Sequence, residues 1–216
     1  MTLSLIDSSA LLVALIAILM VGSTHLRLNL WNFSLQAGLL SLITSLYALQ
    51  QHESHLYLIA GAILVLKALG VPQFLLFIIR KVDVQRDSGT LLRAPLAMHL
   101  SIAFFAISYM LAKQLPVPVT AGAGWPTATA SISLVCTGLI LMLTRRIALS
   151  QIIGFLVMEN GIYLFGLSQT HGMPMLMETG ILLDVLAGVM IAGLIAFRIK
   201  KNFEHIDVTM LADLKE

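Results

Sequence analysis

Long uninterrupted apolar runs dominate the pattern of hydrophobic and polar positions along this chain. Seven of these runs are long enough to cross a bilayer as helices, because about 20 helical residues span its hydrocarbon core. They cover residues 8–23, 30–49, 56–79, 94–112, 127–144, 149–167 and 175–199. The pattern therefore predicts an all-α, polytopic membrane protein with about seven transmembrane helices.

The composition excludes other classes of protein. Of the 216 residues, 58% are hydrophobic and 11% are charged, whereas a soluble domain carries about 25% charged residues. A disordered chain would combine low hydrophobicity with high net charge, and the net charge here is +2. The strands of a membrane β-barrel would alternate with polar lumen residues. The expected surroundings are therefore a lipid bilayer, and the charge gives no indication of a nucleic-acid partner.

The basic residues predict an orientation in the membrane. They gather after every second run, in the loops that follow the first (Arg27), third, fifth and seventh. The loops after the second and sixth runs have none, and the loop after the fourth has only Lys113. The basic residues after the third, fifth and seventh runs are Arg80, Lys81, Arg86, Arg93, Arg145, Arg146, Lys200, Lys201 and Lys215. Because basic loops stay in the cytoplasm, we expect the N-terminus outside, the C-terminus inside, and a location in the cytoplasmic (inner) membrane.

Three charged residues lie near the middle of predicted spans, namely Lys67, Glu159 and Asp184. A charge at the centre of a bilayer costs about 2.5–3.5 kcal/mol on insertion scales, so such residues face the protein interior, pair or titrate. Three interpretations stay open. The three residues form a proton or cation relay, make a static ion pair of Lys67 with Glu159 or Asp184, or bind a substrate. Glu178 lies nearer the start of the last span and is expected at the interface.

His99 lies inside the fourth predicted span. It is interpreted either as a hydrogen-bonded packing residue or as part of a proton path, since histidine titrates near neutral pH. His52 and His55 flank Glu53, but no third histidine is close in sequence, so no metal site is expected. The single cysteine, Cys136, is expected to be apolar filler. No redox, nucleotide-binding or nucleophile motif is present in the sequence, so no catalytic residue is expected in this chain.

Proline and glycine, which alter the backbone and its packing, lead to two further expectations. Pro72 follows Lys67 by five residues, removes a backbone hydrogen bond and is expected to kink the third helix. The glycines of the sixth and seventh runs are expected to allow close helix packing, with local unwinding as the alternative.

A weak internal repeat is a further hypothesis. Helices 1–3 and 5–7 are predicted to share an orientation. In this alignment of the two halves, Lys67 and Asp184 occupy equivalent positions. The same pairing aligns residues 36–38, Gln-Ala-Gly, with residues 159–161, Glu-Asn-Gly. Chance similarity between apolar helices is the alternative.

Two segments resemble the hydrogenase-4 membrane subunits of the HyfE family. They are residues 152–161, Ile-Ile-Gly-Phe-Leu-Val-Met-Glu-Asn-Gly, and residues 180–189, Gly-Ile-Leu-Leu-Asp-Val-Leu-Ala-Gly-Val. The length matches that family as well, so the resemblance covers nearly the whole chain. Residues 127–201 are also similar to the NuoK subunit of respiratory NADH dehydrogenase and to the MrpC antiporter subunit. The resemblance implies an N-terminal membrane part (1–126), a NuoK-like three-helix part (127–201) and a cytoplasmic tail (202–216).

The resemblance also implies a function and roles for individual residues. The chain would be a non-redox membrane subunit of a hydrogenase complex of the formate hydrogenlyase type. Partner subunits would hold the nickel–iron and iron–sulfur centres, so this chain would need no cofactor, and antiporter-like subunits would lie beside it. Glu159 matches the first intramembrane glutamate of NuoK, and Asp184 takes the place of the second, although it is an aspartate. Lys67 and His99 lie outside the NuoK-like part, and complete the set of candidate relay residues. A structural adaptor with static ion pairs and a subunit of a monovalent cation/proton antiporter are the alternatives.

Overall fold

The computed structural model describes residues 2–82, 86–87, 91–115, 124–169 and 188, and this part of the chain is predominantly helical. Its elements are α1 (Thr2–Gly22), α2 (Leu26–Gln51), α3 (Ser54–Ala62), the π-helix η1 (Ile63–Gly70), α4 (Val71–Val82), α5 (Ala94–Ala112), α6 (Trp125–Thr144) and α7 (Ala148–Gln169). Within the described residues, six helices are long and apolar enough to cross a membrane, and α3, η1 and α4 together make one of them. The predicted class, an all-helical multi-pass membrane protein, is confirmed.

Most of the helices extend beyond the apolar runs that predicted them, whereas α5 covers its predicted run, 94–112. Helix α2 was expected over 30–49 and covers Leu26–Gln51, and α1 begins at Thr2 where residue 8 was expected. Hydropathy marks only the apolar stretch of a span, whereas the helix continues into polar residues at the membrane surface. The seventh predicted span, with Glu178 and Asp184, and the tail lie outside the described residues. The internal repeat, which needs that span, stays a prediction.

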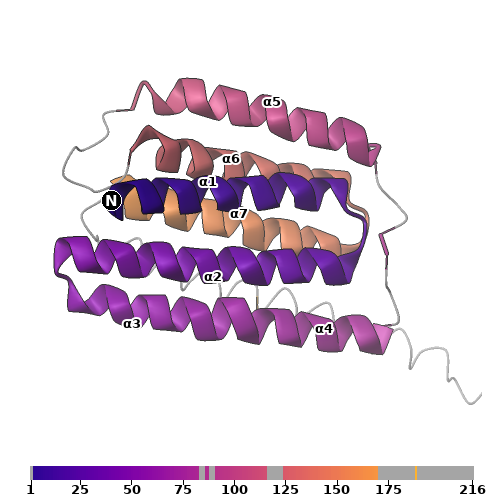
Figure 1. The fold of residues 1–216 in the computed structure, drawn as a ribbon. Coiled ribbons are helices and arrows are strands. Elements are labelled where there is room, and N and C mark those ends of the chain that lie inside the picture. The colour runs from indigo at the N-terminus through magenta and orange to yellow at the C-terminus, as the bar shows by residue number, and fades with distance from the viewer. Residues whose placement is uncertain (1, 83–85, 88–90, 116–123, 170–187, 189–216) are drawn as a thin grey trace, which may run out of the picture.

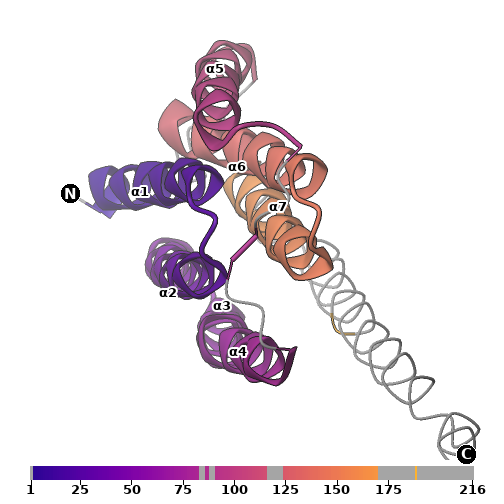
Figure 2. The ribbon, with the colours of Figure 1, turned by 90° about the vertical axis from the view of Figure 1, so that its right-hand side faces the viewer.

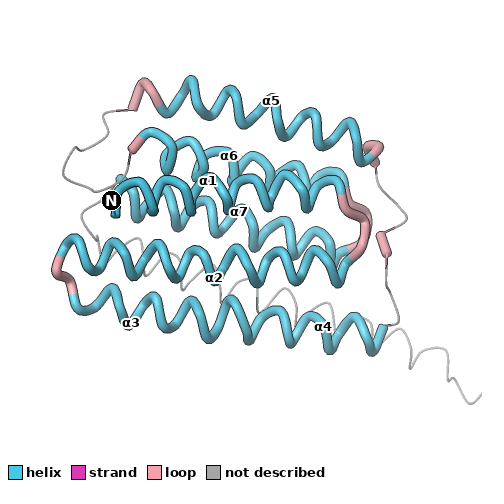
Figure 3. Tube along the Cα trace, in the orientation of Figure 1, coloured by secondary structure: helices cyan, strands magenta, loops and turns pink. Residues whose placement is uncertain are grey.

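The helices form a bundle in which neighbours run along one common direction (Figure 1). Seen from its end, α1, α2, α6 and α7 occupy the middle, α5 lies on one side and α3–η1–α4 on the other (Figure 2). The chain stays helical from α3 through η1 into α4, without a loop between them (Figure 3). Helix α5 packs through the small residues Ala97, Ser101, Ser108 and Ala112, which are buried, and through the partly buried Phe104 and Phe105, while most of its other bulky side chains are exposed.

Helices α6 and α7 approach each other closely at glycines. A Cβ atom on Gly138 would lie 2.5 Å from the backbone nitrogen of Met158, and one on Gly154 would lie 2.9 Å from the backbone nitrogen of Met142. A Cβ atom on Gly161 would lie 2.7 Å from the Val135 nitrogen. The expectation that the glycines of the sixth predicted run allow close helix packing is confirmed at Gly154 and Gly161 of α7.

One end of the bundle, here called the Arg145 end, joins three connections. Arg145 is 2% exposed, and its Nη2 donates hydrogen bonds to the carbonyls of Val21 (2.8 Å) and Ser23 (2.7 Å). The backbone nitrogen of Asp87 donates to the Thr24 carbonyl at 3.0 Å. The connections after the first, third and fifth spans therefore meet at one end, as the alternation of basic loops requires. Which end faces the cytoplasm stays a prediction.

Arg145, which the charge pattern assigns to a basic loop, is buried in that loop. Burial lowers the pKa of its guanidinium from the ordinary value, and the nearby Asp87 carboxylate opposes that shift. A guanidinium is charged at any physiological pH. Arg145 therefore serves as a charged crosslink between α6 and the α1–α2 connection.

The opposite end, here called the Asp7 end, is held by a carboxylate. Asp7 Oδ1 accepts hydrogen bonds from Thr127 Oγ1 at 2.6 Å and from the Gly124 nitrogen at 3.2 Å. Gly124 is the N-cap of α6, and a carboxylate beside a helix N-terminus satisfies free N–H groups and complements the helix dipole. Asp7 thereby fastens the start of α1 to the start of α6.

Candidate functional site in the membrane interior

Lys67 and Glu159 form an ion pair inside the bundle. Lys67 lies on η1 and Glu159 on α7, and Lys67 Nζ donates a hydrogen bond to Glu159 Oε1. The two residues are 4% and 1% exposed. Of the two partners that the sequence left open for Lys67, the structure brings Glu159 to it. The alternative partner, Asp184, lies outside the described residues.

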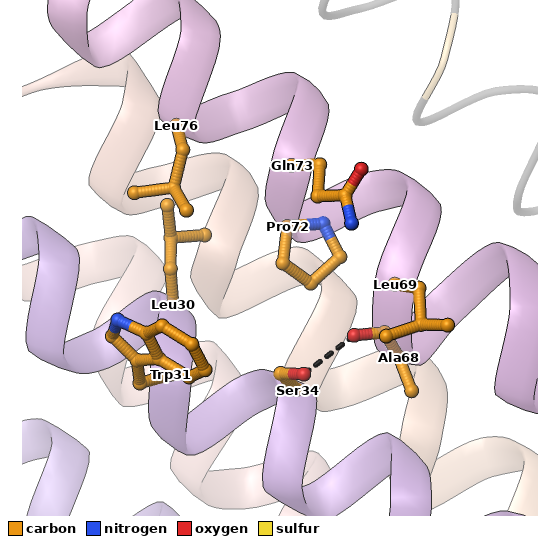
Figure 4. A pocket seen from close by; sticks show the side chains of 8 residues that line it. All are labelled: Leu30, Trp31, Ser34, Ala68, Leu69, Pro72, Gln73 and Leu76. Carbon is orange, nitrogen blue, oxygen red and sulfur yellow. Dashed lines mark hydrogen bonds between the residues drawn. The ribbon is translucent and has the colours of Figure 1, made fainter.

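The π-helix that carries Lys67 ends at Gly70, two residues before Pro72. Proline has no N–H to donate to the carbonyl four residues earlier, and that carbonyl belongs to Ala68. The Ser34 hydroxyl of α2 donates a hydrogen bond to it instead (Figure 4). Within η1, however, the bonding runs five residues back, as from the Val71 nitrogen to the Leu66 carbonyl. The predicted loss of one backbone donor at Pro72 therefore falls where the π pattern meets the α pattern. The π-helix and the bond from α2 accommodate it.

A pocket opens on the surface beside this segment, between α2 and the η1–α4 segment (Figure 4). Apolar side chains make most of its wall, among them Trp31, Leu69 and Pro72. Gln73 adds an amide at its edge, and its side chain is exposed. The pocket adjoins the backbone that carries Lys67.

Further polar groups are buried within the bundle. Asn160, the residue after Glu159, is 0% exposed, and neither atom of its amide has a hydrogen-bond partner among the described residues. Gln36 of α2 is also 0% exposed and donates to the Val13 carbonyl at 3.2 Å. Buried polar atoms without partners are rare in folded proteins and call for an explanation. They make the middle of this bundle more polar than its hydropathy alone indicates.

Hydroxyl groups of Tyr163, Thr44 and Tyr47 lie between the ion pair and the Asp7 end of the bundle. Tyr163 is one helical turn beyond Glu159 on α7, and its Oη is 3.0 Å from Thr44 Oγ1 of α2. Thr44 and Tyr47 are 0% exposed. The sequence analysis did not select these residues. The available signal was spacing, because Tyr163 follows Glu159 by four residues and therefore shares its helix face.

His99 does not join this group. Its side chain is exposed on α5, and its Nδ1 lies 2.7 Å from the Pro95 carbonyl of the same helix. His55 Nδ1 lies 3.2 Å from Glu53 Oε2, and both side chains are about half exposed. In the described part of the chain, no three residues of the types His, Cys, Asp and Glu gather as a metal site would require.

The fold and the buried pair define a multi-pass helical membrane protein with an ion pair in its core. The chain is 26% identical over 213 residues to "Uncharacterized protein Rv0085" of Mycobacterium tuberculosis, covering 98% of this chain and 96% of that protein. It is 24% identical over 212 residues to Hydrogenase-4 component E of Escherichia coli K12 and of Shigella flexneri, covering 98% of this chain and 97% of those proteins. No family model and no solved structure matches the chain. The chain is thus a distant, full-length relative of a hydrogenase-4 component.

Proposed function

We propose that this chain is a non-redox membrane subunit of a hydrogenase-type complex and supports proton translocation through charged groups inside the membrane. The observation that carries the proposal is the Lys67–Glu159 pair, buried within a multi-pass bundle. Ionisable residues at membrane depth typically mark ion or proton pathways. The full-length similarity to Hydrogenase-4 component E supports the setting.

A buried lysine–glutamate pair suits proton transfer for a chemical reason. When one proton moves from the ammonium to the carboxylate, two charged groups become two neutral groups and the net charge of the site stays the same. A proton arriving from a neighbouring group, or a charge change close by, then shifts the balance between the two forms. We place Asp184 in the same relay, as the second carboxylate. The exposed His99 is kept as a candidate only for a step shared with a neighbouring subunit.

The setting follows from the same proposal. Partner subunits hold the nickel–iron and iron–sulfur centres, antiporter-like subunits lie alongside, and residues 127–201 form a NuoK-like unit in the cytoplasmic membrane. The exposed bulky side chains of α5, such as Leu96 and Met110, provide apolar surface for lipid or for such neighbours.

A structural adaptor is the second candidate function. The direct hydrogen bond between Lys67 and Glu159 favours it. A salt bridge between η1 and α7 crosslinks two helices whether or not a proton ever passes. The two functions differ in what happens when Glu159 loses its charge while its shape is kept.

The experiment uses Glu159→Gln in the complete complex, in inverted membrane vesicles. Hydrogen turnover and the proton gradient formed per turnover are measured together, and co-purification of the subunits checks assembly. We expect turnover to persist and the gradient to collapse. The matched control is Glu53→Gln, because Glu53 is an exposed glutamate outside the membrane core. An unchanged gradient per turnover in an assembled Glu159→Gln complex refutes the relay and favours the adaptor.

A further inference from the structure

A line of buried polar groups continues from the ion pair toward the Asp7 end of the bundle. Its first step lies on α7, where Glu159 and Tyr163 are one turn apart and therefore neighbours on one helix face. The second step crosses to α2 through the 3.0 Å contact between Tyr163 Oη and Thr44 Oγ1. The Thr44 hydroxyl also lies 2.8 Å from the Leu40 carbonyl of its own helix.

Tyr47 continues the line along α2. It follows Thr44 by three residues, so the two side chains share a face. Tyr47 is 0% exposed, and its hydroxyl has no hydrogen-bond partner within the described ranges. The carboxylate of Asp7 is close enough to act electrostatically on that hydroxyl. A buried hydroxyl without a partner is costly, and here it lies between a hydroxyl pair and a carboxylate.

Asp7 ends the line at the edge of the bundle. It is partly exposed, and the hydrogen bonds from Gly124 and Thr127 hold its carboxylate in place. A carboxylate held at this partly exposed position is accessible to the solution at this end of the bundle. At the opposite end Arg145 is a buried permanent cation, and the buried Asp87 carboxylate lies near it, so that end carries an opposed pair of charges.

We propose that Asp7, Tyr47, Thr44 and Tyr163 form a proton route between the aqueous phase at the Asp7 end and the Lys67–Glu159 pair. The route rests on the proposed function and adds to it the side from which protons reach the pair. A hydroxyl group both donates and accepts hydrogen bonds. It therefore receives a proton on its oxygen and releases its own, and water bridges steps that no direct contact spans. The proton that enters at the Asp7 carboxylate leaves the route on the Glu159 carboxylate.

The first test removes single hydroxyl groups while keeping their shape, in the vesicle assay described above. Thr44→Val and Tyr47→Phe are expected to lower the proton gradient per turnover by about tenfold or more, since positioned proton-transfer groups contribute factors of this size. Hydrogen turnover and assembly should persist. Tyr109→Phe is the control, because Tyr109 is an exposed tyrosine on α5. Wild-type gradients in both Thr44→Val and Tyr47→Phe overturn the route.

The second test asks whether the route is hydrated, without relying on any activity. Thr44→Cys and Ile43→Cys are each made in the full chain with Cys136→Ala, and silver ion is added from the Asp7 end. Silver is used because it is about as small as water, and protection of the thiol against later maleimide labelling is the readout. Ile43 is the control at the same depth, since it is also 0% exposed but belongs to the hydrophobic core. Thr44→Cys should react at least about tenfold faster than Ile43→Cys, because a polar, hydrated position admits the ion and a dry core does not.

The silver reaction and the Glu159→Gln assay distinguish a failure of the proton route from a failure of the proposed function. Equal, slow reaction of both cysteines overturns the route, even where Glu159→Gln abolishes the gradient and the proposed function stands. An intact gradient in Glu159→Gln overturns the proposed function, whatever the silver reaction shows.

Discussion

The ion pair between Lys67 and Glu159 makes a quantitative prediction about stability. Lys67→Met removes the ammonium and keeps a side chain of similar length, so the Glu159 carboxylate is left in the bundle without that partner. Glu159→Gln leaves the ammonium in the same way. The double variant removes both charges and closes a thermodynamic cycle.

The expected magnitude follows from burial. The two side chains are 5% and 1% exposed, so solvent screening does not reduce their interaction to the 0–1 kcal/mol typical of surface pairs. Removing one partner of a buried pair costs about 3–5 kcal/mol, because the other charge stays uncompensated, whereas replacing both is often nearly neutral. We therefore expect each single variant to lose about 3–5 kcal/mol and the double variant to recover most of that loss.

The assay is reversible unfolding of the purified full chain in mixed detergent micelles, followed by helical circular dichroism. The coupling energy is the difference between the double variant and the sum of the single ones. A coupling below about 0.5 kcal/mol, the usual limit of additivity between distant sites, would refute the reasoning that the two charges depend on each other. The charge-swapped variant Lys67→Glu with Glu159→Lys checks the same point independently and should be more stable than either single swap.

Two more predictions concern packing and the Arg145 end, both measured by the same unfolding assay. Gly138→Ala should cost about 1–3 kcal/mol, because the new Cβ meets the Met158 backbone at 2.5 Å. Gly61→Ala, where nothing lies within 4 Å, should gain up to about 1 kcal/mol from helix propensity, and equal effects at both sites would contradict the close approach. Arg145→Met should cost about 3 kcal/mol through its two lost charge-assisted hydrogen bonds, whereas Arg146→Met, at an exposed position, should stay within about 0.5 kcal/mol. Similar losses at both arginines would refute the crosslink.

Much of the fold was predictable because hydropathy reports directly on the bilayer. Six of the predicted spans appear within the described residues, since each needs only enough apolar length. The side that each helix turns inward was not predictable. A membrane helix is apolar on its lipid face as well as on its packed face, so the usual one-sided pattern is absent. His99 illustrates this, because nothing in its surroundings in the sequence indicates that it faces outward on α5.

The candidate site was predictable in its members but not in its connections. The cost of a charge in a bilayer marks Lys67 and Glu159 without any structure. Their pairing depends on how two helices pack, which lies beyond local sequence. Arg145 was missed for the opposite reason, because a position just past the end of a span looks solvated until the neighbouring connection folds over it.

The distance between Lys67 and Glu159 along the chain has a consequence for biosynthesis. The two residues are separated by 92 positions. At the usual rate of about 5–20 residues per second, the ribosome completes Glu159 roughly 5–18 s after Lys67. During that interval the translocon releases a helix whose lysine has no Glu159 to meet. The span Ser54–Arg80 has a mean hydropathy of 2.3. Its many apolar side chains offset the free-energy cost of inserting the lysine until the helix that carries Glu159 is inserted. Correct insertion of the early half therefore depends on leucines, and its final packing waits for the nascent chain to deliver the counter-charge.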